Sequence, residues 1–361
     1  MPRLAHKHNP EHTSQPSSRT TPEMADLAIV VVSANSARWL QPCLSTVFDR
    51  AGEATLQAIV VDNASTDGTR ELVESRFPRA RLVSSPNRGF AYGNNRGLEL
   101  ARARYVLLLN PDTEVIDGTF GELVAQLDAR PEIGAVGVRQ VKPDGTLCPT
   151  IHHFPSLCRA FGEALASERW PVHPAWAGER EYDPRAYERE VQCDWPTGSF
   201  LLIRREALLS SGLLDERFFL YSEETDLCLR IKRAGWQVWH MPQMTIVHHA
   251  GKAGTQPRIL AQDVYARKQY AHKHFSRPYR DLYLAALTAR YAIRLAGART
   301  GKADDGARRE GARRALLALA GRAEPPFREP PHTALDPRAR AYPQAGSAAS
   351  NHEFEPDRDV L

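Results

Sequence analysis

The sequence lacks the features that mark secreted, membrane-spanning or nucleic-acid-binding proteins. It has five cysteines, an odd number, and no C-x-x-C pair. This fits a reducing compartment better than a secreted fold stabilised by disulfides. It has no run of about 18 consecutive apolar residues, so we expect no transmembrane helix. A net charge of +4 over 361 residues is too small for a chain that binds nucleic acid over its whole surface.

Two glycine-rich motifs are also missing. No G-x-G-x-x-G follows the first apolar run, where a dinucleotide cofactor would need bare backbone against its pyrophosphate, and no G-x-x-x-x-G-K-[ST] occurs. A dehydrogenase or a P-loop NTPase is therefore disfavoured. A nucleotide held through carboxylates and a hard divalent cation, Mg²⁺ or Mn²⁺, remains open, because such ions bridge carboxylate and phosphate oxygens.

Both ends of the sequence lack the periodicity of a packed fold. Residues 1–26 have no apolar stretch of signal-peptide length and are polar and rich in Pro and Ser, so we expect a disordered tail. Residues 300–361 are rich in Ala, Arg, Pro and Gly, which predicts a short helix followed by a low-complexity tail. The absence of a leader and of paired cysteines leads us to expect a cytoplasmic protein.

From residue 27 the sequence alternates between apolar, β-branched runs and segments with helical spacing. The runs 27–35, 56–65, 80–86 and 104–110 predict strands, and 37–50, 66–77 and 92–102 predict the helices between them. Pro42 limits how early the first helix can begin, because only the first turn tolerates a missing N–H. Strands that alternate with helices form βαβ units, so we expect an α/β fold with a parallel sheet.

Polar residues follow three of these strands at the point where each strand ends. They are Ser33 and Asn35 after the first strand, Asp62 and Asn63 after the second, and Asn110 and Asp112 after the fourth. Asn and Asp favour turns, so each pair alone is typical of a turn. Ligands bind at the carboxyl ends of the strands in open α/β sheets, so the three pairs together indicate a binding site.

The second half contains a run of acids and a pair of histidines. The segment "DERFFLYSEETDLCLRIKRAGW", residues 215–236, joins an aromatic patch to an amphipathic helix. Its four carboxylates are Asp215, Glu223, Glu224 and Asp226. A helix N-terminus attracts acidic residues, which accounts for one or two of them better than for three in a row. The run "TIV" ends on His248 and His249, which are equally consistent with ligands and with solvated rings.

Seven stretches in order resemble the inverting family 2 glycosyltransferases, in particular their bacterial rhamnosyltransferase-like branch. They are "VVVSANSARWLQPCLSTV", "VVDNASTDGT", "NRGFAYGNNRGL", "YVLLLNPDTEV", "WPTGSFLLIRREAL", "DERFFLYSEETDLCLRIKRAGW" and "TIVHHAGKAG", within about residues 27–255. The resemblance implies the GT-A type of nucleotide-binding fold, with a mostly parallel central sheet. Over the catalytic domain, 27–260, we expect a nucleotide-binding half at 27–115 and an acceptor half at 116–260, followed by a helical extension at 261–299.

The resemblance also implies which residues bind a nucleotide-diphosphate sugar. Asn110-Pro111-Asp112 occupies the place of the D-x-D motif, so Asp112 would hold the divalent cation on the diphosphate and His248 would complete the metal site. Asp62 would meet the nucleoside. The other residues implied for the nucleotide pocket are Ser33, Asn35, Asn63, Asn87, Gly89, Asn94 and Asn110.

Sugar transfer to a hydroxyl requires a base that takes the hydroxyl proton. The stretch "SEETD" matches the E-D-x-D pattern of the family, with Glu224 where that pattern usually has aspartate. The resemblance favours Glu224 as the base and Glu223 as the second candidate. We expect an acceptor site bordered by Trp195, Thr197, Gly198, Tyr221 and Asp226, with a structural role favoured for Asp226.

The segment 280–299 predicts a basic amphipathic helix. Its apolar residues are Leu282, Leu284, Leu287, Tyr291 and Leu295, and its basic residues include Arg290, Arg294 and Arg299. Such a helix either lies on an anionic membrane surface or packs on the catalytic domain with its arginines in solvent.

These features predict a metal-dependent, inverting glycosyltransferase. It would move a sugar, rhamnose by the branch resemblance, from a nucleotide-diphosphate sugar to a glycan or lipid-linked acceptor in polysaccharide or cell-envelope synthesis. We expect it in the cytoplasm or on the inner face of the plasma membrane, without a nucleic-acid partner. Two alternatives stay open: a catalytically degenerate nucleotide-binding or scaffold protein of a glycan assembly complex, and a sugar nucleotidyltransferase.

Overall fold

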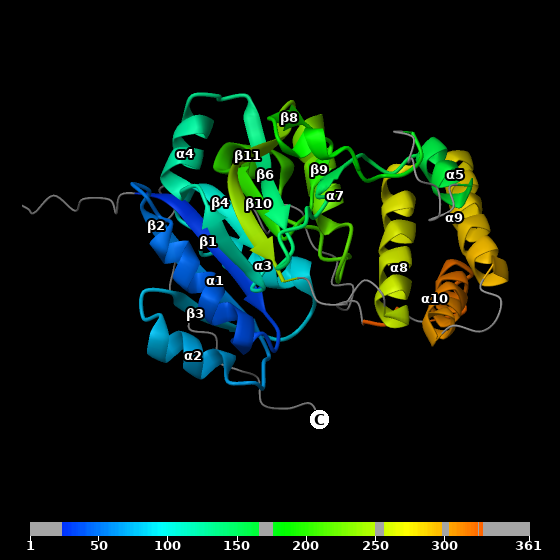
Figure 1. Cartoon of the computed structure of the whole chain (residues 1–361), viewed down its shortest axis with the longest axis horizontal. Coiled ribbons are helices and arrows are strands. Elements are labelled where there is room, and N and C mark those ends of the chain that lie inside the picture. The colour runs from blue at the N-terminus through cyan, green and yellow to red at the C-terminus, as the bar shows by residue number, and fades with distance from the viewer. Residues whose placement is uncertain (1–23, 166–175, 250–255, 298–302, 324, 328–361) are drawn as a thin grey trace, which may run out of the picture.

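The computed structural model describes residues 24–165, 176–249, 256–297, 303–323 and 325–327. Residues 1–23 of the predicted N-terminal tail and most of the predicted C-terminal tail lie outside the described residues, while residues 25 and 26 already belong to the first strand. Figure 1 shows a central sheet with helices on its faces and a group of helices at one end of the molecule.

The central sheet has nine strands in the order β3-β2-β1-β4-β10-β6-β11-β5, with β8 paired to β11. The strands are β1 (Ala25–Ser33), β2 (Leu56–Asn63), β3 (Arg81–Ser85), β4 (Ala103–Leu109), β5 (Thr113–Asp117), β6 (Ile133–Val141), β8 (Val191–Gln192), β10 (Phe200–Arg204) and β11 (Gln237–His248). Six of them run in the direction of β1, while β5, β8 and β10 run against it. The predicted mostly parallel sheet is confirmed. A separate two-stranded sheet pairs β7 (Ile151–His152) with β9 (Trp195–Pro196).

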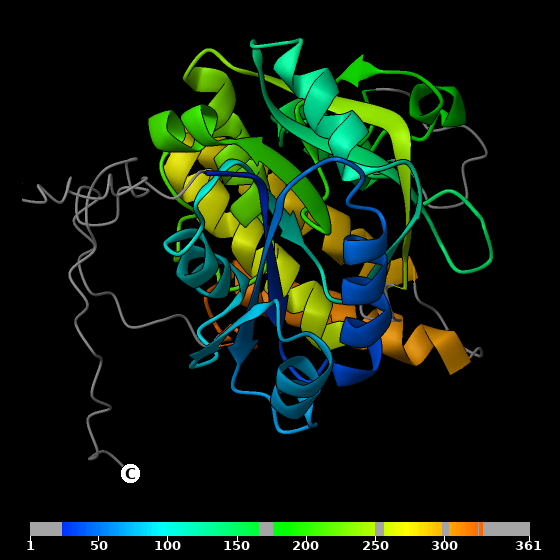
Figure 2. The ribbon, with the colours of Figure 1, turned by 90° about the vertical axis from the view of Figure 1, so that its left-hand side faces the viewer.

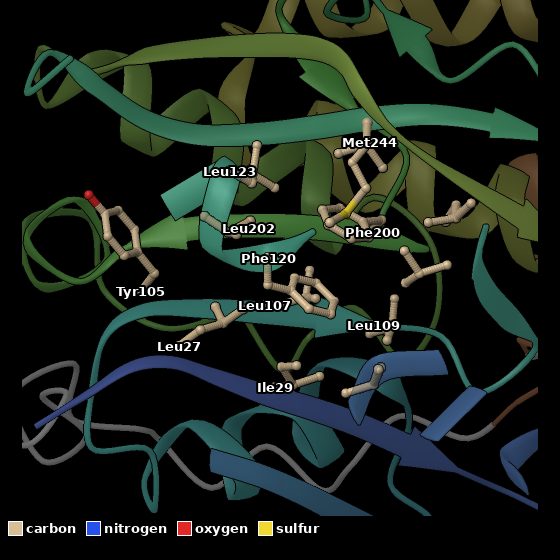
Figure 3. Packing of buried hydrophobic residues seen from close by; sticks show 14 of the residues in the cluster. Leu27, Ile29, Tyr105, Leu107, Leu109, Phe120, Leu123, Phe200, Leu202 and Met244 are labelled. Atoms are coloured by element: carbon tan, nitrogen blue, oxygen red, sulfur yellow. The ribbon is translucent and has the colours of Figure 1, made fainter. Parts of the chain in front are cut away.

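Helices cover both faces of the sheet, because successive residues of a strand point to opposite sides. Leu27, Ile29 and Val31 of β1 pack against α1 (Ala37–Asp49), α2 (Thr69–Arg76) and α4 (Phe120–Asp128). The alternate residues of β1 pack against α3 (Phe90–Leu98), α6 (Arg205–Ser211) and α7 (Glu223–Arg233). Figure 2 shows α1 and α3 on opposite sides of β1, and Figure 3 shows Leu27 and Ile29 in the first of these cores.

The structure corrects one expectation about α1. Pro42 lies inside the helix, which begins five residues earlier, at Ala37. Leu40, Cys43, Leu44 and Val47 are buried on one side of α1, so packing against the sheet outweighs the hydrogen bond that the proline cannot make.

The C-terminal helices form a group of their own. They are α8 (Pro257–His274), α9 (Arg277–Gly297) and α10 (Ala303–Leu319), and α5 (Leu157–Leu165) packs with them although it comes from the middle of the chain. A short 3₁₀ helix, Pro184–Tyr187, precedes β8. The predicted helical extension is confirmed. Among the residues that the structure describes, no helix is both long and apolar enough to span a bilayer.

Candidate functional site

The carboxyl ends of β1, β2 and β4 bring the three predicted pairs of polar residues to one edge of the sheet. Ser33 is the register partner of Asp62, and β4 lies on the other side of β1. Ser33 is fully buried and Asp62 and Asn63 are each 4% exposed. The Ser33 hydroxyl and the Oδ1 of Asn63 have no hydrogen-bond partner among the residues that the structure describes. Buried polar atoms without partners are expected where a ligand supplies them.

Two loops at this edge hold each other in place. The backbone N–H of Asn35 donates to Ser65 Oγ at 2.9 Å, and Asn35 Oδ1 accepts from the Thr66 N–H at 2.8 Å. Asp62 Oδ1 accepts from the Ser65 N–H at 3.0 Å. Asn35 has a φ of 55°, a left-handed conformation that Asn tolerates better than most residues. Asn35 and Asp62 therefore also shape the rim that they were predicted to line.

Gly89 connects the loop after β3 to the loop before α7. Its φ is 102°, and a Cβ there would lie 2.3 Å from the carbonyl oxygen of Phe219, so only glycine fits. The next N–H, of Phe90, donates to that same oxygen at 2.7 Å. Asn63 Nδ2 donates to the Gly89 carbonyl at 3.2 Å, and the Gly89 N–H donates to Asn87 Oδ1 at 3.3 Å. The stretch "NRGF" thus joins β2 to the loop before Glu223.

Asn94 is buried like Ser33, Asp62 and Asn63. It is 1% exposed on α3, where its Nδ2 donates to the Phe90 carbonyl at 3.0 Å and its Oδ1 lacks a partner. Gly93 and Gly97 let this helix approach the sheet, because a Cβ at Gly97 would lie 2.3 Å from Val30.

Asp112 and His248 meet where β4, β5 and β11 come together. β11 pairs with β5 so that His248 lies opposite Thr113, and His248 Nε2 lies 3.4 Å from Asp112 Oδ1. Burial alone would lower the pKa of His248, but hydrogen bonds with Asp112 and Cys148 raise it to about 9. Burial opposes ionisation of Asp112 as well, and the hydrogen bond with His248 overcomes it, so the pKa of Asp112 is lowered.

The Asp112–His248 pair suits a divalent cation whose coordination is completed by a bound ligand. It offers one carboxylate and one imidazole, donors that Mn²⁺ accepts, while phosphate oxygens and water fill the remaining positions. No set of three or more His, Cys, Asp and Glu side chains placed to hold a metal occurs within the described parts of the chain. His249 is engaged elsewhere, because its Nε2 lies 2.6 Å from Glu114 and its ring stacks on Trp39.

Glu223 and Glu224 begin α7 beside the turn that leads into β10. A Cβ on Gly198 would lie 3.4 Å from Glu224 Oε1, so the Glu224 carboxyl group is in contact with this turn. The Asn110 N–H donates to the Ser199 carbonyl at 3.0 Å, so the same turn is fixed to the end of β4. The Oε2 atoms of Glu223 and Glu224 are buried and have no hydrogen-bond partner within the described parts of the chain, and burial raises the pKa of both carboxyl groups.

The backbone before these two acids is strained. Tyr221 and Ser222 have φ values of 72° and 67°, a conformation unusual for two successive residues that are not glycine. Such strain persists only where the surrounding structure holds it, and it clusters at functional sites. Here it immediately precedes Glu223 and Glu224, of which Glu224 contacts Gly198.

The predicted acceptor residues Trp195 and Thr197 share a partner, His152. The rings of His152 and Trp195 stack with their centroids 4.0 Å apart, and His152 Nε2 lies 3.1 Å from Thr197 Oγ1. Burial keeps the pKa of His152 well below its usual value, so the ring is neutral. These residues form a wall next to Gly198.

A model of glycosyl transferase family 2 matches residues 28–209, half of the chain. The chain belongs to this family. It is therefore a glycosyltransferase, and the matched segment contains the donor edge, Asp112 and the Gly198 turn.

Two curated relatives and one solved structure are similar to this enzyme. The N-acetylglucosaminyl-diphospho-decaprenol L-rhamnosyltransferase of Mycobacterium tuberculosis is 32% identical over 244 residues, which cover 64% of this chain and 78% of the relative. The O-antigen biosynthesis protein RfbC of Myxococcus xanthus is 26% identical over 68% of this chain and 19% of its own length. The crystal structure of GalNAc-T7 with UDP, GalNAc and Mn²⁺ has a TM-score of 0.51 at 14% identity and covers 74% of this chain and 51% of that one. This likeness shows the GT-A fold.

The surroundings of Asp226 support the structural role that the sequence favoured for it over a place at the acceptor site. Its side chain is fully buried, with Oδ2 2.9 Å from Arg230 Nε and Oδ1 2.5 Å from Lys273 Nζ and 2.7 Å from His274 Nε2. No acceptor reaches a carboxylate so enclosed. Asp226 instead ties α7 of the enzyme to α8.

His152, Cys148 and Asp263 lie near the predicted site residues, although no sequence motif marks them. His152 is part of the conspicuous pair in "IHHF", but nothing in the sequence connects it to Trp195. Asp263 lies on α8, and its charge adds to the burial that raises the pKa of Glu224. A hollow of about 310 Å³ between α8 and Arg217 is lined by none of the predicted site residues.

Proposed function

We propose that this enzyme transfers a sugar, with inversion, from a nucleotide-diphosphate sugar to a lipid-linked glycan acceptor in the synthesis of a bacterial cell-envelope polysaccharide. The observation that carries the proposal is the meeting of Asp112 and His248, 3.4 Å apart, at the sheet edge where Ser33 and Asn63 keep unpartnered polar atoms. Similarity to the mycobacterial enzyme, whose name specifies an L-rhamnosyl donor group and a decaprenyl-linked acceptor, supports rhamnose and a lipid-linked acceptor.

On the donor side, Ser33, Asn35, Asp62 and Asn63 would bind the nucleoside part, with Asn87, Gly89, Asn94 and Asn110 around it. Asp112 and His248 would hold Mn²⁺ or Mg²⁺, whose positive charge stabilises the departing diphosphate when the ion is bound. The GalNAc-T7 structure was solved with Mn²⁺ and UDP, which supports a divalent cation in this fold.

On the acceptor side, Glu224 would take the proton of the attacking hydroxyl. Its Oε1 contacts Gly198, and its buried Oε2 has no hydrogen-bond partner among the described residues, so an acceptor hydroxyl that enters the site would supply one. A carboxylate whose pKa is raised by burial is a better base near neutral pH than an ordinary one. Glu223 is the second candidate, and Trp195, Thr197 and Tyr221 would contact the acceptor sugar.

We would test the donor site by calorimetry. The diphosphates of uridine, deoxythymidine and guanosine are titrated into the full chain with and without Mn²⁺, and the best ligand is then titrated into Asp112→Asn. We expect metal-dependent binding of the deoxythymidine compound and a loss of about tenfold to a hundredfold in the variant. The control is Asp117→Asn, an exposed aspartate at the end of β5, which should bind as the wild type does.

Two results would oppose the proposal. Lack of binding to all three diphosphates by a folded sample would favour the scaffold alternative. Unchanged binding in Asp112→Asn would remove Asp112 from the metal site. The stereochemistry is tested separately by the anomeric configuration of the product, which should be opposite to that of the donor.

A further inference from the structure

Exposed apolar side chains gather on two neighbouring helices, α5 and α9. Of the ten large hydrophobic residues exposed in the described chain, five lie there: Phe161, Leu165, Tyr279, Leu282 and Ile293. Leu165, Leu282 and Ile293 are each more than half exposed, at 65%, 52% and 54%. Monomeric proteins rarely leave such groups uncovered without a binding role.

The two helices lie side by side and run in the same direction. Near their starts the Leu157 N–H donates to the Tyr279 hydroxyl at 2.8 Å, and further along Glu163 pairs with Arg290. Figure 1 shows both at the end of the molecule away from α1 and α2. With parallel axes, helical spacing places Phe161 and Leu165 on the same side of the pair as Leu282 and Ile293.

The exposed stripe of α9 contains no charged residue. Leu282, Ala285, Ala289, Ile293 and Ala296 recur at helical spacing and are all exposed. The opposite side of α9, with Tyr283, Leu287 and Tyr291, is buried against the other helices. We call Phe161, Leu165, Leu282, Ala285, Ala289 and Ile293 the α5–α9 face.

The structure therefore changes which side of this helix is available. The sequence left open whether the apolar side with Leu287 and Tyr291 lies on a membrane or packs on the catalytic domain. Both residues are buried, so this side packs inside the protein, and Arg290 pairs with Glu163. The stripe that stays uncovered is the one next to α5.

Charge near the face favours one kind of partner. Residues 257–297, which form α8 and α9, contain eight Lys and Arg but only two Asp and no Glu. Four acids of other elements pair with three of these bases: Glu179 with Arg267, Asp215 and Asp226 with Lys273, and Glu163 with Arg290. The helical group with these partners keeps a surplus of two positive charges. An apolar strip on a positively charged helical group matches a bilayer with anionic lipids, where apolar burial and charge attraction act together.

We propose that the α5–α9 face docks on an anionic lipid bilayer. This inference rests on the proposed function, since a lipid-linked acceptor lies in a membrane. Docking through this end of the molecule would hold the enzyme at the surface where such an acceptor is found.

The test is flotation of the full chain with vesicles of phosphatidylcholine, alone or mixed with phosphatidylglycerol, in the absence of donor and acceptor. We expect binding to the mixed vesicles and weaker binding at high salt. The double variant Leu282→Glu/Ile293→Glu should lose at least about tenfold in partitioning, because both side chains would leave the lipid.

Matched controls come from exposed hydrophobic residues elsewhere. Ile116→Glu on β5 and Leu209→Glu on α6, at residues 45% and 39% exposed, should bind vesicles as the wild type does. Equal binding by the double variant and the wild type, or no binding by the wild type, would overturn the inference. So would concentration-dependent dimers that the double variant abolishes, because a second copy would then cover the face.

The vesicle test is independent of catalysis. A wild type that binds nucleotide diphosphates but not vesicles would refute only the membrane surface. A wild type that binds vesicles but no diphosphate would refute only the proposed transfer. If both hold, the double variant should use a water-soluble acceptor normally and a vesicle-embedded acceptor poorly.

Discussion

Asp226→Asn tests whether Asp226 has a structural role in this protein. The family pattern alone would place this acid near the reacting groups. The substitution keeps the shape of the side chain but removes the charge that faces Arg230, Lys273 and His274. Burial opposes ionisation of Asp226, yet its hydrogen bond with His274 and its basic neighbours lower its pKa below the ordinary value. The stabilisation is therefore present at neutral pH and lost as the pH falls through the folded-state pKa.

The expected loss in the free energy of unfolding depends on which partners Lys273 and Arg230 retain in the variant. Removing one partner of a buried ion pair costs about 3–5 kcal/mol when the other charge is left alone. Here Lys273 retains Asp215 at 2.7 Å, and Arg230 retains the carbonyls of Gly212 and Leu213. We therefore expect the lower end, a loss of about 3 kcal/mol in the free energy of unfolding.

Urea unfolding at neutral pH measures this loss, and calorimetry with the nucleotide diphosphate measures donor binding on the same samples. Donor affinity should be unchanged wherever the variant is folded. The control Glu74→Gln removes an exposed pair with Arg70 and should change the free energy of unfolding by less than about 0.5 kcal/mol. Wild-type stability combined with lost transfer in Asp226→Asn would refute the structural role and return Asp226 to the acceptor site.

Three further predictions concern the base and one glycine. Glu224→Gln should lower kcat by about 10²–10⁴-fold with unchanged donor affinity, whereas Glu223→Gln should lower it less; the reverse order would make Glu223 the base. Because the pKa of Glu224 is raised above its ordinary 4.5, kcat/KM of the wild type should fall on the acid side at a pH above 4.5. For the same reason Glu224→Gln should be more heat-stable than the wild type at neutral pH, since the variant no longer buries a charge. Gly89→Ala should cost about 1–3 kcal/mol more than Gly145→Ala, because both have positive φ but only Gly89 faces a backbone oxygen; equal melting temperatures would contradict this.

Local sequence features predicted much of the donor half. The runs that end at Ser33, Asn63 and Leu109 are strands because their β-branched and apolar residues suit a sheet buried on both faces. The polar residues after them could be assigned to one edge because parallel strands present their carboxyl ends together. The position of Pro42 was misjudged, since the packing of a whole helix decides against one local preference.

The acceptor half was harder to predict, because its parts are joined by contacts between distant segments. No local pattern shows that β10 inserts antiparallel between β4 and β6, or that His152 stacks on Trp195. The burial of Asp226 depends on Lys273 and His274, which α8 supplies from far along the chain.

The sequence by itself determined the alternation of strands and helices, the polar strand ends and the membership of a glycosyltransferase family, because these depend on the order of residue types along the chain. Tertiary structure alone decided which acid stays near the Gly198 turn, which acid is enclosed by cations, and which side of α9 remains uncovered. Those outcomes depend on the direction in which each side chain points after packing, and helical or strand spacing leaves that direction open until a neighbouring element takes one face.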